Sequence, residues 1–307
     1  MDFKLLFVAL LLGVSLNAQQ RVELGDVKWL RNYDTAMEQA KEMDKPVFIL
    51  FQEVPGCSTC QNYGKDVLTH PLIVEAIEDL FIPLVIQNNK SGHDAKILKK
   101  FGEPSWNNPV VRIVSNDEKQ LVPRVARQYT STQLVSAMNA ALANDNREIP
   151  GYLNLLEEEL TILNSGTQET FISMYCYWSG EKNIAKQKGV AYTEAGFMDG
   201  REVVKVTYSP DFIEYQTLLD EASKAQCASA SYTDNRSEQE ASRKVLGNGK
   251  QHGKKAYRKA HDDKYYLNRS NLKKVAMTDL QKTRINSMLG QGLDPSELLS
   301  PRQLASL

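Results

Sequence analysis

Neither sign of charge predominates in this sequence, and it has no internal repeat and no low-complexity tract. Its 307 residues include 37 Lys and Arg against 38 Asp and Glu, which leaves a formal net charge of −1 at pH 7. A chain so close to neutrality has no overall field that would attract nucleic acid or an anionic membrane, so we expect neither as a partner. The length and the 42% hydrophobic content are typical of a globular protein with two domains.

Long apolar runs are missing after residue 18, so we expect no stable membrane span in the rest of the chain. Residues 1–18 have the pattern of a cleaved secretory signal, with the cation Lys4, an apolar run over 5–16 and Ala18 before Gln19. The run is shorter than the roughly 20 residues of a comfortable span, which favours cleavage over an uncleaved anchor. No cysteine directly follows it to carry a lipid. We therefore expect a periplasmic or secreted protein, in a compartment where cysteines serve as disulfide or redox groups.

Cysteine and histidine are both scarce, and this limits the metal sites that the chain can form. The cysteines are Cys57, Cys60, Cys176 and Cys227, and the histidines are His70, His93, His252 and His261. Beside the pair Cys57 and Cys60, no second cysteine pair or histidine pair has the spacing of zinc ligands. Half of a zinc site is therefore the weaker interpretation of this pair, and we predict no metal and no other cofactor.

The first half of the chain alternates strand and helix patterns. Apolar runs over 47–51 and 81–87 predict two buried strands. Helices are predicted at 29–43, 57–67, 71–80, 95–101 and 133–143, and an antiparallel strand pair at 108–114 and 120–127. This order predicts an α/β domain over 19–146, in which a mixed central sheet is flanked by helices and the cysteine pair follows the carboxyl end of the first strand.

Cys57 and Cys60 stand at the start of a predicted helix, close enough to form a small disulfide ring. The unpaired N–H groups and the positive end of the helix dipole favour the thiolate of Cys57. Because the thiolate is the attacking species in disulfide exchange, we predict that Cys57 is the nucleophile and Cys60 the buried resolving thiol. A purely structural disulfide is the alternative, although so small a ring adds little chain-entropy stabilisation.

The cysteine pair belongs to a wider pattern, made up of Trp29, Ala36, Lys45-Pro46, the apolar strand, Cys57-Ser58-Thr59-Cys60 and His70-Pro71. With these residues, the segment 25–145 resembles the thioredoxin-like domains of exported and thiol-relay proteins. The resemblance implies a thioredoxin fold in which Pro109 is a cis-proline opposite the cysteines and the Asn108 backbone lines the substrate groove. A simple strand start is the alternative for Pro109. The lead Val54-Pro55-Gly56 is similar to a bacterial group in which selenocysteine can stand where Cys57 stands, which implies that this position carries the chemistry.

The second half of the chain follows a polar linker. Residues 147–166 are predicted to form a linker helix. Strands at 170–175, 190–197 and 202–208, with helices after Cys176 and at 215–225, predict a small α+β domain over 167–228. Residues 229–307 are predicted to form a basic segment, exposed or partly mobile as far as 263, and then a helical C-terminal extension. The basic run 250–264 could contact phosphate or nucleic acid, but a solvated surface is the favoured interpretation.

Three segments of the second domain occur in a recognisable order: Tyr175–Glu181 (YCYWSGE), Tyr192–Phe197 (YTEAGF) and Glu202–Pro210 (EVVKVTYSP). They are similar to motifs of peptide methionine sulfoxide reductase A. The resemblance implies that Cys176 attacks the sulfoxide sulfur and becomes a sulfenic acid, while Tyr177 and Trp178 bind the substrate methyl group. Cys227 is the candidate second thiol in this half. The alternative for Cys176 is a small buried apolar residue.

The second domain departs from that family at its proton donors. Phe197 replaces a tyrosine whose hydroxyl holds the sulfoxide oxygen, and the loop with the acid/base glutamate is expected to be lost between Gly200 and Glu202. The later His-Asp-Pro and Gln-Tyr-Arg elements are not recognisable. Because the sulfoxide oxygen must be protonated to leave, we expect such a site to be slow or inactive. Glu181 or Glu194 could substitute, although a solvated carboxylate is the favoured interpretation of both.

The leading hypothesis is an exported thiol-disulfide oxidoreductase whose dithiol centre also reduces the fused domain after methionine sulfoxide reduction. Tethering would raise the effective concentration to about millimolar if the linker lets the centres meet. The expected partners are protein thiols and disulfides or oxidised-methionine peptides, together with an upstream thiol reductant. In the alternative, the second domain is a non-catalytic module that binds clients for the first.

Overall fold

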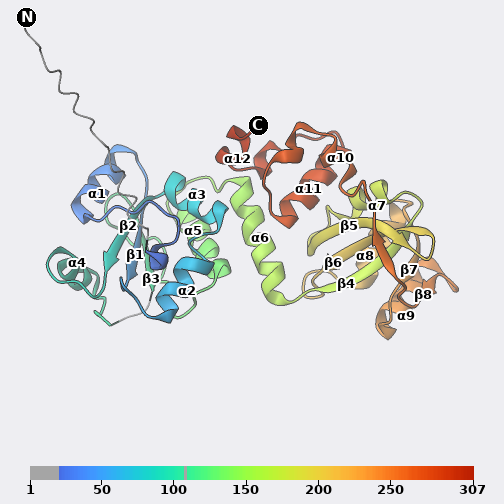
Figure 1. Ribbon diagram of the computed structural model, residues 1–307, viewed down its shortest axis with the longest axis horizontal. Coiled ribbons are helices and arrows are strands. Elements are labelled where there is room, and N and C mark those ends of the chain that lie inside the picture. Colours follow the sequence, from blue (N-terminus) through green and yellow to red (C-terminus); the bar gives the residue numbers. More distant parts are fainter. Residues whose placement is uncertain (1–20, 107–108) are drawn as a thin grey trace, which may run out of the picture.

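The computed structural model describes residues 21–106 and 109–307 (Figure 1). Two folded units lie on either side of helix α6 (Gly151–Ser165), and a helical C-terminal segment runs from the second unit back toward the first. The predicted secretory signal at 1–18 and Asn108 both lie outside the described residues. Within those residues, no helix is long and apolar enough to cross a membrane.

The first unit is built on a three-stranded sheet in the order β2-β1-β3. Strand β1 (Val47–Gln52) is buried at every position. It pairs in parallel with β2 (Ile82–Gln87) and in antiparallel orientation with β3 (Val110–Val114). The flanking helices are α1 (Tyr33–Glu42), α2 (Ser58–Asp66), α3 (Pro71–Leu80), α4 (His93–Phe101) and α5 (Ser131–Asn144). Because successive side chains of β1 point to opposite faces, Phe48 packs in one hydrophobic core and Ile49 in the other. The predicted mixed sheet flanked by helices is confirmed.

The segment 120–127 differs from the predicted strand. Within the described residues it meets β3 only through isolated bridges, which join Val111 to Val125 and Val114 to Gln120. Pro123 lies between these bridges and has no N–H to donate, so a continuous ladder does not form. The segment therefore runs antiparallel to β3 without becoming a strand.

The second unit has a six-stranded sheet in the order β8-β7-β4-β6-β5-β9. Its strands are β4 (Gln168–Met174), β5 (Val190–Met198), β6 (Arg201–Tyr208), β7 (Ala228–Tyr232), β8 (Gln251–His252) and β9 (Tyr257–Lys259). The helices that pack against it include α7 (Tyr177–Ile184), α8 (Tyr215–Lys224) and α9 (Arg236–Leu246). The predicted α+β architecture of this half is confirmed.

This sheet continues beyond the boundary predicted at residue 228. The segment 229–263, expected to be exposed or partly mobile, contributes most of β7, all of β8 and β9, and α9. Polar contacts hold it in place: Glu238 is buried on α9 and accepts hydrogen bonds from the hydroxyls of Tyr208, at 2.8 Å, and of Thr233. Contacts of this kind leave no apolar periodicity in the sequence, so the segment looks solvated when the sequence is considered alone.

Helix α6, the predicted linker helix, is bonded on both of its sides. Asn139 of α5 donates a hydrogen bond to Glu157 at 2.6 Å. On the other side, Arg284 of α11 (Asp279–Gly290) pairs with Glu158 at 2.6 Å and donates to the carbonyl of Gln187 in the second unit at 3.0 Å. The linker is therefore a packed structural element and not a free tether.

The C-terminal segment ends on the first unit. It comprises α10 (Tyr265–Asn268), α11 and α12 (Pro301–Ala305), in agreement with the predicted helical extension. The carboxylate of Glu75 on α3 is buried and accepts from the Ser300 hydroxyl at 2.5 Å and from the Arg302 N–H at 2.7 Å. The chain thus returns to its first unit after passing through the second (Figure 1).

Candidate functional site

The first cysteine centre lies where β1 ends and α2 begins. Cys57 is the N-cap residue of α2 and is exposed, whereas Cys60 lies one turn into the helix and is fully buried. The two sulfur atoms are 3.7 Å apart, and none of the four cysteines is in a disulfide. The fold therefore gives the two thiols of the pair very different surroundings.

These surroundings act in opposite directions on the two thiols. Hydrogen bonding from the Cys60 backbone N–H outweighs a small effect of burial and lowers the pKa of Cys57. Burial raises the pKa of Cys60 to about 12. Cys57, at the positive end of the α2 dipole, is thus the thiol that ionises more readily, and Cys60 stays protonated at neutral pH.

Buried contacts fix the turn that precedes Cys57. The Gly56 N–H donates to the carboxylate of Glu23 at 2.8 Å, and Glu23 is only 3% exposed. A Cβ at Gly56 would lie 2.5 Å from the Glu53 carbonyl and 2.6 Å from the Cys60 Cβ, so only glycine fits this close approach. Asn89 clamps the same turn by accepting from the Val54 N–H at 3.3 Å. The Val-Pro-Gly lead is therefore a rigid support for the cysteine pair.

The residues predicted to line the substrate groove are only partly described. Pro109 is buried directly before β3, whereas Asn108 lies outside the described residues, so the peptide bond between them does too. A cis peptide is found instead between Val54 and Pro55, in the turn before Cys57. The groove role of Asn108 and Pro109 stays a prediction.

A third ligand-type side chain lies beside the cysteine pair. One carboxylate oxygen of Glu53 and the sulfur atoms of Cys57 and Cys60 lie within 4.8 Å of one another. Among the described residues this is the one group of three or more such side chains that could hold a metal ion. The spacing of cysteines and histidines in the sequence does not indicate this group, because its third member is a carboxylate.

The second cysteine centre lies at the junction of β4 and α7. Cys176 is the N-cap residue of α7 and half-buried, and it follows Tyr175, an aromatic residue that is 83% exposed. The carboxylate of Glu202, at the start of β6, accepts a hydrogen bond from the Tyr177 N–H at 2.9 Å. The fold thus brings the carboxylate of Glu202 to the residue next to Cys176, while the predicted loss of the loop with the acid/base glutamate stays a prediction.

The aromatic residues after Cys176 pack against their own chain. Asp262 accepts from the Tyr177 hydroxyl at 2.8 Å and from the Trp178 indole N–H at 3.0 Å. The Trp178 ring stacks on Tyr265 at 3.8 Å between centroids, and the Tyr177 ring meets Phe197 edge-on at 5.6 Å. Burial, reinforced by Asp262, raises the pKa of Tyr177 to about 12. The predicted substrate-binding pair is therefore occupied by contacts with residues 262–265.

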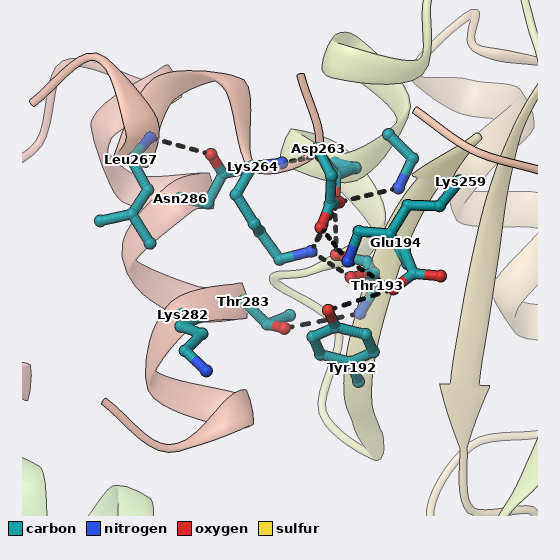
Figure 2. A network of polar contacts seen from close by, with 12 residues as sticks. Tyr192, Thr193, Glu194, Lys259, Asp263, Lys264, Leu267, Lys282, Thr283 and Asn286 are labelled. Carbon is teal, nitrogen blue, oxygen red and sulfur yellow. Dashed lines mark hydrogen bonds and ion pairs between the residues drawn. The ribbon is translucent and has the colours of Figure 1, made fainter. Parts of the chain in front are cut away.

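A buried ionic network anchors these residues (Figure 2). Glu181 is fully buried on α7, pairs with the ammonium group of Lys264 at 2.8 Å and accepts from the Thr193 hydroxyl at 3.1 Å. Lys259 joins Glu194 at 2.7 Å and Asp263 at 3.0 Å. Glu181 is therefore a buried structural carboxyl group and not the solvated carboxylate favoured by the sequence.

Electrostatics in this network keep its lysine charged. Burial opposes the charge on Lys264, but the adjacent carboxylates of Glu181 and Asp263 outweigh burial and raise the pKa of Lys264. Neighbouring Asp262 lies on the same turn and holds Tyr177 and Trp178. The network thus positions the turn that covers the second cysteine centre.

Cys227 lies beside the second centre. It is buried directly before β7, and its carbonyl accepts from the N–H of Tyr175 at 3.3 Å. Its thiol donates to the carbonyl of Ala225 at 3.2 Å and accepts from Asn183 of α7 at 3.5 Å. The fold thus brings the backbone of Cys227 alongside Tyr175, the residue that precedes Cys176, although Tyr175 and Cys227 are 52 positions apart in the sequence.

A cavity of about 570 Å³ lies away from both cysteine centres. It lies between α3 and the C-terminal segment, beside the contact of Glu75 with Arg302, and its lining includes His70, Leu72, Met277 and Gln303. None of the four cysteines lines it. The cavity therefore does not coincide with either thiol centre.

Comparison with known proteins agrees with the geometry of the first centre. A family model described as Thioredoxin-like matches residues 28–126, the stretch that holds the sheet, α2 and the cysteine pair. Residues 28–126 form a thioredoxin-like domain.

Two solved structures are similar to this chain, with TM-scores of 0.33 and 0.32. The first, a DsbH oxidoreductase, is 17% identical and covers 43% of this chain and 94% of its own. The second, a protein described as a disulphide-isomerase from Bacteroides thetaiotaomicron, is 15% identical and covers 40% of this chain and 96% of its own.

The chain is also similar to a protein of a second kind. The peptide methionine sulfoxide reductase MsrA of Methanococcus maripaludis strain C5 is 35% identical to this chain over 72 residues. The match covers 18% of this chain and 46% of the relative, so the chain spans about half the length of the curated relative that it matches. The protein thus combines a thioredoxin-like domain with a region similar to this reductase.

Proposed function

We propose that the protein is a thiol-disulfide oxidoreductase in which Cys57 attacks and Cys60 resolves. The observation that carries the proposal is the asymmetry of the pair. One sulfur is exposed at a helix N-terminus with a lowered pKa, and the other is buried 3.7 Å away with a raised pKa. A structural disulfide does not require a difference in pKa and exposure between its two thiols. Disulfide exchange does, because it needs one accessible thiolate and one protected thiol. The thioredoxin-like domain supports the same assignment.

The proposed exchange has two steps. The Cys57 thiolate attacks one sulfur of a substrate disulfide, which forms a mixed disulfide and releases the other substrate sulfur as a thiolate that takes up a proton. Cys60 then loses its proton and attacks the Cys57 sulfur, so that an intramolecular disulfide forms and the second substrate thiol leaves. Two electrons pass to the substrate, and an external dithiol returns them. In this proposal Asn108 and Pro109 contact the substrate chain.

Insulin-disulfide reduction with dithiothreitol tests the proposal. We expect Cys57→Ser to abolish catalysis, and Cys60→Ser to accumulate the mixed disulfide, because the resolving thiol is missing. Cys176→Ser is the matched control, since it removes a thiol from the other unit and should leave insulin reduction unchanged. Full activity of Cys57→Ser would refute the proposal.

Reduction of methionine sulfoxide at Cys176 is a second candidate function. The observation that favours it is Glu202, whose carboxyl group lies beside the Cys176–Tyr177 peptide. In the proposed reaction Cys176 attacks the sulfoxide sulfur and Glu202 protonates the oxygen, which yields methionine and a cysteine sulfenic acid. Cys227 then attacks the sulfenic sulfur, forming a disulfide and water. Because α6 is packed and separates α2 from α7 (Figure 1), we propose that an external dithiol reduces this disulfide.

The competing proposal is that the second unit binds clients without catalysis. The contacts of Tyr177 and Trp178 with Asp262 and Tyr265 favour it, since they occupy the aromatic surface that a substrate methyl group would need. Turnover of a peptide sulfoxide with dithiothreitol distinguishes the two. Catalysis requires that Cys176→Ser and Glu202→Gln each lose at least about a hundredfold in rate. If the unaltered protein binds the peptide sulfoxide without turnover, the second unit is a binding module and not a reductase.

We also propose that the protein is exported, on the pattern of residues 1–18. N-terminal sequencing of the protein purified from its cells should find Gln19 or a neighbouring residue at the start. A protein that retains Met1 and stays with the cytosolic fraction would contradict this proposal.

A further inference from the structure

The first cysteine centre has the composition of a metal site as well as that of a redox site. Its three ligand-type atoms are two sulfurs, from Cys57 and Cys60, and one carboxylate oxygen from Glu53. Glu53 follows β1 and the cysteines begin α2, so the three residues come from the two ends of one tight turn. A sheet and a helix therefore hold the ligands from both sides.

The distance between the sulfurs agrees with one particular geometry. Two thiolates bound at about 2.3 Å to one tetrahedral zinc ion lie about 3.8 Å apart. The observed separation of Cys57 and Cys60 is 3.7 Å. In the same geometry, an oxygen ligand at about 2.1 Å lies about 3.6 Å from each sulfur. All three atoms already lie within 4.8 Å of one another, so a rotation of the half-exposed Glu53 side chain can complete the site.

We propose that the reduced Cys57/Cys60 pair binds one Zn²⁺ ion together with the carboxylate of Glu53. Thiolate ligands favour zinc over magnesium and calcium, which prefer all-oxygen ligands. The carboxylate ligand favours zinc over copper(I), which prefers sulfur alone. With three protein ligands, the fourth tetrahedral position faces the exposed side of Cys57 and can take water or a substrate thiolate.

Three features of the surroundings support this site. The Gly56 N–H bond to buried Glu23 and the Asn89 clamp hold the turn, so the ligands need little reorganisation. The α2 N-terminus stabilises the negative charge of the Cys57 thiolate. Cys60 is buried while Cys57 is exposed, which provides an entry path on one side and exclusion of water on the other.

Zinc binding and disulfide exchange exclude each other in this arrangement. Binding converts two thiols and one Zn²⁺ into a zinc dithiolate and releases two protons, with no electron transferred, because zinc is not redox-active. A disulfide has no thiolate to offer. The site is therefore specific for the reduced state, and bound zinc protects Cys57 from electrophiles.

Competition with a chromophoric zinc chelator under anaerobic conditions tests the proposal on the full chain. We expect one Zn²⁺ per reduced chain and no binding after oxidation with diamide. Cys57→Ser and Cys60→Ser should each lose at least about a hundredfold in affinity, and Glu53→Gln at least about tenfold. Glu42→Gln, an exposed carboxylate on α1, is the matched control and should bind zinc as the unaltered protein does.

Each alternative result has a definite meaning. Equal zinc affinity of Glu53→Gln and the unaltered protein would overturn the three-ligand site, and so would equal binding by the oxidised protein. Far-UV circular dichroism and cobalt(II) absorption check that the variants are folded and that sulfur is bound. The inference goes beyond disulfide exchange. Zinc binding without insulin reduction would support the zinc site and refute the proposed function. Insulin reduction without zinc binding would support the proposed function and refute the zinc site.

Discussion

The difference in reactivity between the two thiols of the first centre can be measured directly. Burial raises the pKa of Cys60 from an ordinary value of 9.0 to about 12. Three pH units correspond to about 4 kcal/mol and to a roughly thousandfold smaller thiolate fraction at neutral pH. Because the thiolate is the species that reacts with iodoacetamide, a short pulse on the reduced protein at pH 7 should modify Cys57 and leave Cys60 at least about a hundredfold slower.

Peptide mass spectrometry of the quenched samples gives both rates. The Cys57 rate should rise with pH through a midpoint below 9.0, since the Cys60 N–H stabilises the thiolate and so lowers the pKa. In Cys57→Ser, Cys60 should stay slow, because burial is the main cause of its raised pKa and survives the substitution. Similar rates for the two thiols, or a Cys57 midpoint at or above 9.0, would refute the assignment of nucleophile and resolving thiol.

Three further substitutions test the contacts that hold the second unit and the C-terminal segment. Asp262→Ala removes the acceptor of Tyr177 and Trp178 and should shift tryptophan emission and lower the free energy of unfolding in urea by about 2–3 kcal/mol; unchanged emission would contradict the contact. Lys264→Met leaves buried Glu181 without its counter-ion and should lower the free energy of unfolding by about 3–5 kcal/mol. The double variant with Glu181→Gln should recover most of this loss. A loss below about 1 kcal/mol in Lys264→Met would argue against a buried pair. Glu75→Ala removes the acceptor of Ser300 and Arg302 and should speed proteolytic release of the chain after Leu299. Insulin reduction should stay unchanged. Equal cleavage rates of the variant and the unaltered protein would show that other contacts hold α12.

Elements with a strong local signal could be predicted from the sequence. The unbroken apolar run of β1, the proline at the start of α3 and the Thr130 cap of α5 each act within a few residues, and these elements lie where the patterns indicate. The cysteine pair at the start of α2 belongs to the same class. Local patterns thus predicted the framework of the first centre and the end of the first strand at which it lies.

Residues whose role depends on distant partners could not be predicted in this way. Glu202 lies 25 positions after Tyr177, and Asp262 lies 85 positions after it, so only the folded sheet brings them together. Glu181 and Lys264 are separated by 83 positions, and without its partner Glu181 looks like any exposed helix carboxylate. In each case the missing information is the pairing of strands β5, β6 and β9, which has no signature within a single segment.

The contact of Glu75 with Ser300 and Arg302 changes how the order of the units along the chain should be understood. The second unit is enclosed between α6 and the last turns of a chain that closes back on its first unit. A body joined at one point sweeps a wide volume, whereas a body joined at two points can only rotate about the line between them. Any approach of Cys176 to the thiols of the first unit is therefore limited by both connections. A tag fused after Leu307 would lie next to α3, at the first unit, and not at the far end of the molecule.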